Sequence, residues 1–188
     1  KDPPVFTLSL RSAAQLTREL CALKPALLYL PAEEIAQHPK AVETALDTAG
    51  HVGVILPRIC WDREREELDK QLTAARSLGV TDALVGTLDL IAPAREHGFT
   101  LRGDFGLPIF NSQAIKELKR LGFVSCTASF ELKLAQIRDL SKLIDLEIMV
   151  YGRLPLMITV NCILKNRDGG CKRSCEGENR LLVDRKGE

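Results

Sequence analysis

The sequence predicts an α/β fold of the TIM-like (β/α)8 barrel type, followed by a cysteine-containing C-terminal appendage. Seven short apolar runs recur along the chain, and helical patterns separate several of them. The runs are continuous rather than alternating, which is typical of parallel strands buried on both faces. The distances between runs leave room for helical crossovers, so we expect parallel βαβ units.

The expected strands are the apolar runs at residues 5–10, 26–30, 51–56, 83–88, 99–105, 123–129 and 146–151. Helices are expected at residues 12–23, 62–78, 112–121 and 133–143, with Ser12 as the first N-cap and Asn111 or Ser112 as a later one. Gly79 and Gly122 stand where two of these helices should end. A complete barrel usually has about 250 residues. We therefore expect either a compact barrel with short helices or one that lacks a piece.

Two regions are expected along the chain. Residues 1–160 carry the βα repeats, and residues 161–188 form a polar tail that contains cysteines. The chain begins at Lys1 without a methionine and stops within a charged segment, so we expect it to be part of a longer protein, with its other half supplied by the rest of the chain or by a partner subunit.

Composition narrows the function classes. Hydrophobic residues make up 45% and charged residues 27% of the chain, which suits a globular domain. The net charge of +1 gives no general reason to expect a nucleic-acid or membrane surface. No apolar run approaches the ~20 residues of a transmembrane helix. The six cysteines are too few for a disulfide scaffold, which favours a reducing, cytoplasmic location with one thiolate site.

Polar residues that follow the expected strands are the first candidates for function. In a barrel of parallel strands, reactive side chains lie where each strand ends. This rule selects Arg11, Arg58, Cys60, Asp89, Asp104, Asn111, Glu131, Tyr151 and Arg153. Arginines and carboxylates gathered at one mouth could bind an anionic or carbonyl-rich substrate through paired hydrogen bonds. The alternative is that these residues are helix caps and ion pairs of the loops.

The cysteines after the last expected strand give a sharper signal. Cys162, Cys171 and Cys175 lie close together in the polar tail. Thiolates are soft ligands that suit zinc or an iron–sulfur cluster, and such sites normally need four ligands. The fourth ligand could be Cys60, Cys126 or a residue beyond the chain, although Cys126 also fits a small buried hydrophobe. The alternative is free surface thiols or one incidental disulfide.

Several segments together resemble a known family. The segments LPRI (residues 56–59), DFGLPIFNSQAI (104–115), SFELKLAQI (129–137), VYGRLPLM (150–157) and DRKG (184–187) occur here in the order found in the collagenase-like peptidases, which form the unknown-mechanism peptidase family thirty-two. The resemblance runs from about residue 50 onward and is closest to the C-terminal barrel region of the longer members. The signature of their catalytic half, of the form HGALC, does not occur in this sequence.

The resemblance implies a cofactor and a reaction. Similar family members are oxygen-independent hydroxylases that act on RNA bases or on a quinone precursor and hold a 4Fe–4S cluster on four cysteines. Cys162, Cys171 and Cys175 would then be three of the cluster ligands, with zinc as the alternative metal. The implied substrate is RNA or a small aromatic molecule.

We assign roles to the mouth residues on the same basis. Arg58 and Arg153 would bind an anion, Asp104 and Glu131 would position donors or handle protons, and Tyr151 would stack or form a hydrogen bond. Three functions stay open at this point. The favoured one is a cluster-dependent hydroxylase or RNA-modification module. The others are a metal-assisted peptidase and a non-catalytic, substrate-binding half of a larger enzyme.

Overall fold

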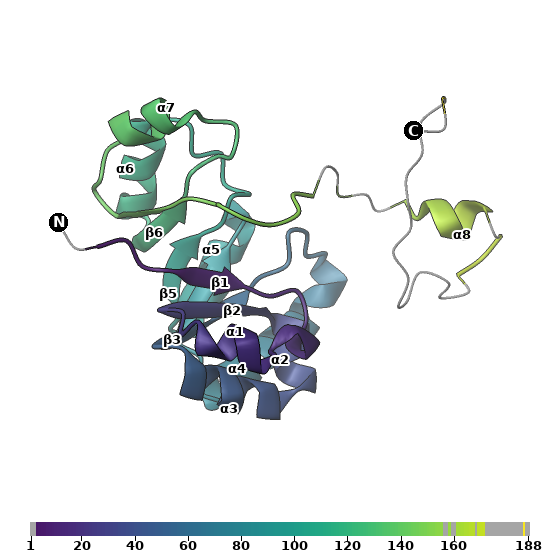
Figure 1. Ribbon diagram of the computed structural model, residues 1–188. Helices are drawn as coiled ribbons and strands as arrows, with labels where there is room; N and C mark the ends of the chain where they lie inside the picture. Colours follow the sequence, from purple (N-terminus) through teal and green to yellow (C-terminus); the bar gives the residue numbers. More distant parts are fainter. Residues whose placement is uncertain (1–2, 156–157, 159–160, 168, 172–185, 187–188) are drawn as a thin grey trace. The chain divides into compact units, whose positions relative to one another are not determined.

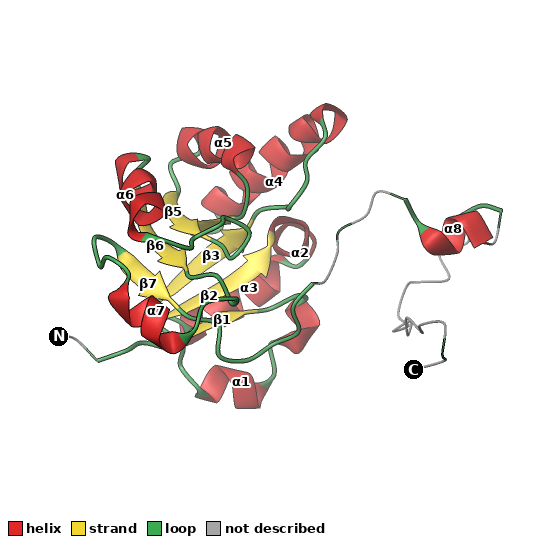
Figure 2. Ribbon diagram, turned by 90° about the horizontal axis from the view of Figure 1, so that it is seen from above, coloured by secondary structure: helices red, strands yellow, loops and turns green. Residues whose placement is uncertain are grey.

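A computed structural model of the chain describes residues 3–155, 158, 161–167, 169–171 and 186. The chain divides into two compact units, Lys1–Val150 and Tyr151–Glu188. The first unit is built on one sheet of seven parallel strands whose order follows the chain (Figures 1 and 2). Within the described part of the second unit, α8 (Ile163–Arg167) is the regular element. No helix of the described residues is long and apolar enough to cross a bilayer.

All seven expected strands are confirmed. They are β1 (Thr7–Ser9), β2 (Leu27–Pro31), β3 (His51–Ile55), β4 (Asp82–Val85), β5 (Thr100–Gly103), β6 (Phe123–Thr127) and β7 (Asp145–Glu147). Every neighbouring pair is parallel, and the connections are long enough for the crossovers that parallel strands need. The sheet curls into a half-barrel with alternating helices, which confirms the α/β, TIM-like fold (Figure 2).

Helices connect the strands and pack on the convex face of the sheet. The α-helices of this unit are α1 (Arg18–Ala22), α2 (Ala32–Gln37), α3 (Pro39–Thr48), α4 (Arg65–Ser77), α5 (Ile91–Glu96), α6 (Ser112–Arg120) and α7 (Leu134–Asp139). Short 3-10 turns η1 (Ala13–Gln15), η2 (Asp62–Glu64) and η3 (Leu88–Leu90) precede α1, α4 and α5. Figure 2 shows the helices around the yellow strands.

The convex face carries the main hydrophobic core. Val52 and Val54 of β3 are fully buried there, together with Ile35 of α2 and Leu72 of α4. Side chains of a strand alternate between the two faces of a sheet, so the residues between these point to the concave side. A second and smaller cluster lies there, made of Leu27, Tyr29 and Leu84 with Ile55 packed against them.

The expected helix at residues 12–23 is wrong in one respect, because the structure has two shorter elements there. Ser12 does cap the first, and its Oγ accepts a hydrogen bond from the backbone N–H of Ala14 at 3.3 Å. Thr17 then adopts an extended backbone and begins α1, and its Oγ1 accepts from the backbone N–H of Leu20 at 3.4 Å. A hydroxyl that can cap a helix start favours a break over a continuous helix.

The start of α6 and the ends of α4 and α6 agree with the sequence. Asn111 caps α6, and Gly79 and Gly122 end α4 and α6 with φ of 90° and 87°. These positive φ values are the left-handed conformation that glycine adopts without strain. The last expected helix is shorter than predicted, since α7 ends at Asp139 and the backbone of Leu140 is extended.

A hydrogen-bonded polar network crosses the concave face. Asp82 of β4 is buried, and its Oδ1 accepts from Arg102 Nε of β5 at 2.6 Å. Arg102 also donates to Ser125 Oγ of β6 at 3.3 Å, and Ser125 donates to Glu147 Oε1 of β7 at 2.8 Å. The network therefore links four successive strands inside the half-barrel.

Glu147 extends this network to the other edge of the sheet. Its Oε2 accepts from Thr7 Oγ1 of β1 at 3.2 Å, and its Oε1 accepts from the Tyr29 hydroxyl of β2 at 3.4 Å. The Tyr29 ring lies over Gly53 of β3, where an added Cβ would come within 2.6 Å of the ring. The last strand is thus tied to the first two by side chains across the interior.

Candidate binding site at the barrel mouth

Arg58 lies at the carboxyl end of β3, just past Pro57, and its guanidinium turns toward the loops that follow β4 and β5. The Arg58 Cζ atom lies 4.9 Å from the centroid of the Phe105 ring, which is a cation–π contact. Its NH1 atom is buried and has no hydrogen-bond partner. Buried donors are nearly always satisfied in proteins, so an unpartnered guanidinium nitrogen at a barrel mouth points to a ligand.

Two glycines make room for this guanidinium. A Cβ at Gly106 would lie 2.6 Å from Arg58 Cζ and 2.6 Å from the carbonyl oxygen of Gly86. A Cβ at Gly86 would lie 3.0 Å from Arg58 Cδ. The loop after β4 and the loop after β5 therefore pack directly against the arginine, and a side chain at Gly106 would displace it.

Asp104 lies beside Arg58 at the end of β5. It is 9% exposed, and its Oδ1 accepts a hydrogen bond from the backbone N–H of Phe105 at 2.8 Å. Burial raises the pKa of the Asp104 carboxyl, although that hydrogen bond and the charge of Arg58 act in the opposite direction. A buried carboxyl with a raised pKa keeps its proton to higher pH than a carboxyl in water does, which is a property of groups that handle protons.

Thr87, in the loop after β4, carries a second unsatisfied group. Its Oγ1 is buried without a hydrogen-bond partner, as is Arg58 NH1, and these two are the buried side-chain atoms of this kind in the described part of the chain. Thr87 directly follows Gly86, which packs on Arg58. The two orphan groups thus come from adjoining loops, after β3 and after β4.

Apolar side chains surround these polar groups. The rings of Phe105 and Phe130 lie with centroids 6.1 Å apart, and Phe130 is 47% exposed. Ile59 and Leu88, the neighbours of Arg58 and Thr87 in the chain, are also exposed. The mouth therefore offers charged and hydroxyl donors beside aromatic and aliphatic surface, which suits a ligand with a polar end and an apolar body.

Of the five predicted catalytic residues, the structure brings together Arg58 and Asp104. Glu131 is exposed, and in the described structure only its backbone N–H forms a hydrogen bond, to Ser129 Oγ at 3.3 Å. Tyr151 and Arg153 belong to the second unit, where both are exposed. The assignments of Glu131, Tyr151 and Arg153 stay predictions.

Other strand-end candidates have structural partners. Asp89 Oδ2 accepts from Arg65 NH2 at 3.1 Å, and Asn111 Oδ1 accepts from the backbone N–H of Ala114 at 2.9 Å. For these two residues the alternative of loop ion pair and helix cap is therefore confirmed. Arg11 offers its backbone N–H to Gln15 Oε1 at 2.7 Å.

The predicted cysteine ligands fall in the second unit. Cys162 and Cys171 are exposed free thiols, and Cys162 Sγ accepts from the backbone N–H of Lys165 at 3.4 Å. Cys175 lies outside the described residues. Among the residues that are described, no group of three metal-binding side chains is gathered. The metal site stays a prediction.

The two cysteines of the first unit that were considered as a fourth ligand differ in setting. Cys126 is fully buried in the main core, as expected for a small hydrophobe, and burial raises the pKa of its thiol to about 11. Cys60 is half-buried near the mouth, and burial raises the pKa of its thiol as well. Raised pKa values disfavour the thiolate that a metal needs.

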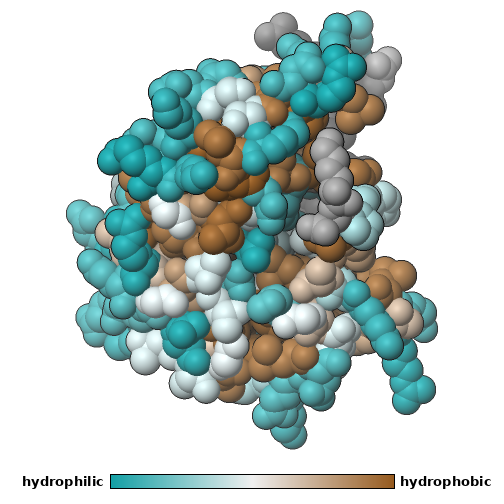
Figure 3. All heavy atoms as spheres, turned by 90° about the vertical axis from the view of Figure 1, so that its left-hand side faces the viewer, coloured by the Kyte–Doolittle hydropathy of each residue, from teal (hydrophilic) through white to brown (hydrophobic). Residues whose placement is uncertain are grey.

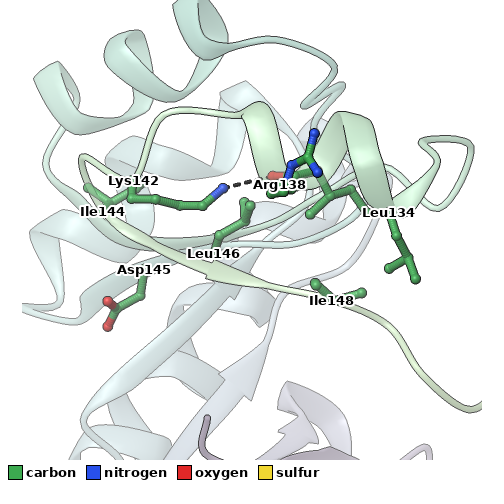
Figure 4. A pocket seen from close by; sticks show the side chains of 8 residues that line it. Leu134, Arg138, Lys142, Ile144, Asp145, Leu146 and Ile148 are labelled. Carbon is green, nitrogen blue, oxygen red and sulfur yellow. Dashed lines mark hydrogen bonds between the residues drawn. The ribbon is translucent and has the colours of Figure 1, made fainter. Parts of the chain in front are cut away.

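A groove beside the edge strand β7 is the second feature that could bind a ligand. It lies between α7 and β7 and is lined by aliphatic side chains such as Leu134 and Ile148, together with Arg138 and Lys142 (Figure 4). The Lys142 ammonium already donates to the carbonyls of Ile137 and Leu140 at 2.7 and 2.8 Å. Hydrophobic residues also reach the surface on the face shown in Figure 3. The lysine already has hydrogen-bond partners, whereas Arg58 at the mouth has an unpartnered donor, so the mouth is the better candidate for binding a polar ligand.

Four mouth residues were not predicted from the sequence: Gly86, Thr87, Phe105 and Gly106. Phe105 and Gly106 follow Asp104 within the segment DFGLPIFNSQAI, so the resemblance had marked the loop but not these side chains. Gly86 and Thr87 fall inside the expected strand at residues 83–88, which ends earlier, at Val85. A glycine followed by a threonine in an apolar run is the one signal that could have indicated the strand end.

Comparison with known proteins agrees with this fold. The family model for peptidase family U32 matches residues 30–187. Among solved structures, the chain is similar to the U32 peptidase Mk0906, with a TM-score of 0.52 and 16% identity over 79% of this chain and 70% of that one. An L-Ala-D/L-Glu epimerase gives a TM-score of 0.45 and 17% identity, over 77% of this chain and 49% of that one. No match was found among curated proteins.

The family match covers well over half of the chain and includes the whole mouth, from Arg58 to the loop after β6. This match rests on the sequence and does not use the strand order or the contacts around Arg58. The chain belongs to peptidase family U32.

Proposed function

We propose that this chain is the substrate-binding barrel of an oxygen-independent, iron–sulfur-dependent hydroxylase that acts on RNA or on a related aromatic molecule. The observation that carries the proposal is the composition of the mouth. A guanidinium with an unpartnered buried nitrogen lies on an aromatic ring, beside a buried carboxyl whose pKa is raised. This arrangement suits a planar, polar substrate and a proton transfer near it.

Each mouth residue has a role in this proposal. Arg58 donates from NH1 to an oxygen of the substrate or of the oxygen donor and fixes its orientation. Phe130, which is half-exposed beside Phe105, contacts the apolar part of the substrate. Asp104 accepts or returns a proton at Oδ2, since its Oδ1 is held by the backbone N–H of Phe105.

The cysteines of the second unit fit a cluster in their chemistry. Cys162 and Cys171 are free and exposed, so both can act as thiolate ligands, and Cys175 would be the third ligand. When bound, a 4Fe–4S cluster would supply one-electron redox chemistry. The fourth ligand would come from another part of the parent protein or from a partner subunit, and zinc is the alternative metal.

Anaerobic purification with iron and acid-labile sulfide analysis tests the cofactor. We expect a brown protein with about four irons per chain, and a loss of iron in Cys162→Ser and Cys171→Ser variants. Cys21→Ser is the matched control, because Cys21 is a free thiol of α1 in the other unit. Stoichiometric zinc, or no metal under anaerobic conditions, would contradict the cluster.

A substrate test separates the hydroxylase from the peptidase. The assay measures hydroxylation of RNA by the intact, active protein. Arg58→Ala should abolish this hydroxylation while leaving the iron content unchanged. Arg65→Ala is the control, because that arginine is paired with Asp89 at the same end of the barrel. Cleavage of gelatin that depends on metal and is lost in one point variant would favour the metal-assisted peptidase instead.

A further inference from the structure

Glu147 is a second carboxyl that faces the same interior as Asp104. In the strand register, Cys126 of β6 lies between Gly103 of β5 and Leu146 of β7. Asp104 and Glu147 come one residue further along, so they are level, with one strand between them. Cys126 and Leu146 pack in the core of the convex face, and the side chains that follow them in their strands point to the concave side.

Backbone hydrogen bonds hold both residues in this register. The N–H of Asp104 donates to the carbonyl of Val85 at 2.9 Å, and the N–H of Ala128 donates to the carbonyl of Glu147 at 2.9 Å. Asp104 also follows Arg102 by two residues, and Arg102 belongs to the network of the concave face. The two carboxyls therefore share one layer of the half-barrel.

The surroundings of Glu147 favour its ionised form. Its carboxylate accepts hydrogen bonds from Ser125 at 2.8 Å, from Thr7 at 3.2 Å and from Tyr29 at 3.4 Å. The positive charge of Arg102 lies close enough for the two charges to attract each other. Hydrogen bonds and an opposite charge both stabilise a carboxylate relative to a protonated carboxyl.

The surroundings of Asp104 favour its protonated form. The hydrogen bond that this carboxyl receives in the described structure runs from the backbone N–H of Phe105 to Oδ1 at 2.8 Å. Burial is the largest cause of the raised pKa of Asp104, and the charge of Glu147 adds to it, whereas the Phe105 hydrogen bond and the charge of Arg58 act in the opposite direction. An added Cβ at Gly86 would lie 3.3 Å from Oδ2 and 3.4 Å from Arg58 Nε, so Oδ2 is on the side of Arg58.

We propose that Glu147 is a positioning residue for the Asp104 proton: the two form a carboxyl pair in which Glu147 carries the charge and the first proton taken up goes to Asp104 Oδ2. The inference deepens the proposed function and rests on it for the assumption that Asp104 exchanges a proton with the substrate. Like charges in one partly buried layer repel each other, so an ionised Glu147 opposes a second charge on Asp104. The proton belongs on Oδ2 because Oδ1 accepts from Phe105.

Other ionisable groups face the carboxyl pair from four elements. Arg58 comes from the loop after β3, and Arg102 of β5 is bound through Nε to the buried Asp82 of β4 at 2.6 Å, so those two charges largely offset each other. Tyr29 of β2 and Cys126 of β6 stay neutral from acidic to neutral pH, because burial raises the pKa of Tyr29 and raises that of Cys126 to about 11. A change in the titration of Asp104 on removal of the Glu147 charge therefore reports on the pair itself.

The test follows the carboxyl carbon of Asp104 by NMR as the pH of the full chain is raised, with Asp104→Asn to assign the signal. Glu147→Gln keeps the shape and removes the charge, so it should shift the midpoint of Asp104 ionisation to lower pH. Asp145→Asn is the matched control, because it removes a carboxylate from the same strand that is exposed to water, and it should leave the midpoint in place. An unchanged midpoint in folded Glu147→Gln, or equal shifts in the two variants, would overturn the proposal.

The unmodified chain gives a second reading that does not depend on how the variants fold. The carboxyl carbon of Glu147 should titrate at lower pH than that of Asp104. The reverse order would place the proton on Glu147 and refute the assignment.

The pH–rate profile separates this role from a structural one. In the hydroxylation assay, Glu147→Gln should move the limb that reports Asp104 to lower pH, whereas a loss of structure alone would lower the rate at every pH. The NMR titration needs neither cluster nor substrate. A chain with coupled carboxyls that hydroxylates nothing would keep this inference and lose the proposed function, and an active hydroxylase whose Asp104 midpoint ignores Glu147→Gln would do the reverse.

Discussion

Replacing Glu147 tests whether the interior network holds the half-barrel together. Glu147→Ala removes the acceptor of three hydrogen bonds, from Ser125 at 2.8 Å, Thr7 at 3.2 Å and Tyr29 at 3.4 Å. A hydrogen bond to a charged group contributes about 1.5–3 kcal/mol, and the two longer ones belong at or below the low end of that range. We therefore expect the free energy of unfolding to fall by roughly 2–4 kcal/mol.

Glu147→Gln separates charge from geometry. Its amide oxygen can still accept from Ser125 and Tyr29, but its NH2 group cannot accept from Thr7. The loss should be about half of that in Glu147→Ala. Because β1 and β7 each pair with one neighbour only in the sheet, amide hydrogen exchange should quicken first in these two edge strands.

Urea unfolding is the assay, with Glu43→Ala as the matched control on the exposed side of α3. A double-mutant cycle with Tyr29→Phe isolates one bond, since the buried tyrosine hydroxyl has Glu147 as its acceptor. We expect a coupling energy of about 1 kcal/mol. If Glu147→Ala loses less than about 0.5 kcal/mol relative to the control, the network does not hold the edges.

Three further predictions concern the mouth, the cysteines and the core. Burial raises the pKa of Asp104 in the folded chain. The protonated carboxyl therefore contributes stability at low pH, and this contribution is lost as pH rises through the raised pKa. Asp104→Asn, which cannot ionise, should flatten the decline of urea midpoints measured from acidic to neutral pH. Cys162 and Cys171 should react with iodoacetamide in the native protein, whereas Cys126, whose pKa burial raises to about 11, should react only after unfolding, as peptide mapping would report. Leu72→Ala should cost about 2–5 kcal/mol in urea unfolding because Leu72 is fully buried, and a smaller loss would mean that α4 packs loosely.

The fold was predictable because its signals are local and repeated. Each strand is a short apolar run, and parallel strands buried on both faces leave that pattern directly in the sequence. The glycines after α4 and α6 marked helix ends for the same reason, since a positive φ selects glycine at one position. The break before Thr17 was missed because a single hydroxyl, not a change of pattern, decides it.

The candidate site was predictable only in part. The rule that function gathers at strand ends located Arg58 and Asp104, but it also selected Asp89 and Asn111, which have structural partners. Sequence position reveals neither burial nor partners, and these separate the two groups. Thr87 was missed because its importance lies in a hydroxyl that lacks an acceptor, which is a property of the folded chain.

The two polar clusters of the barrel differ in whether their hydrogen-bonding groups have partners. Inside the half-barrel, every charge of the Asp82–Arg102 and Glu147 network has hydrogen-bond partners, and such a network rigidifies the strands that carry it. At the mouth, Arg58 and Thr87 keep donors that nothing in the described chain accepts. Arg102 and Asp104 lie two residues apart on one strand and its extension, so the satisfied network fixes the strand that carries the mouth carboxyl. A rigid lower layer lets the upper layer hold unsatisfied groups in place for a ligand, which is the arrangement that binding and catalysis both require.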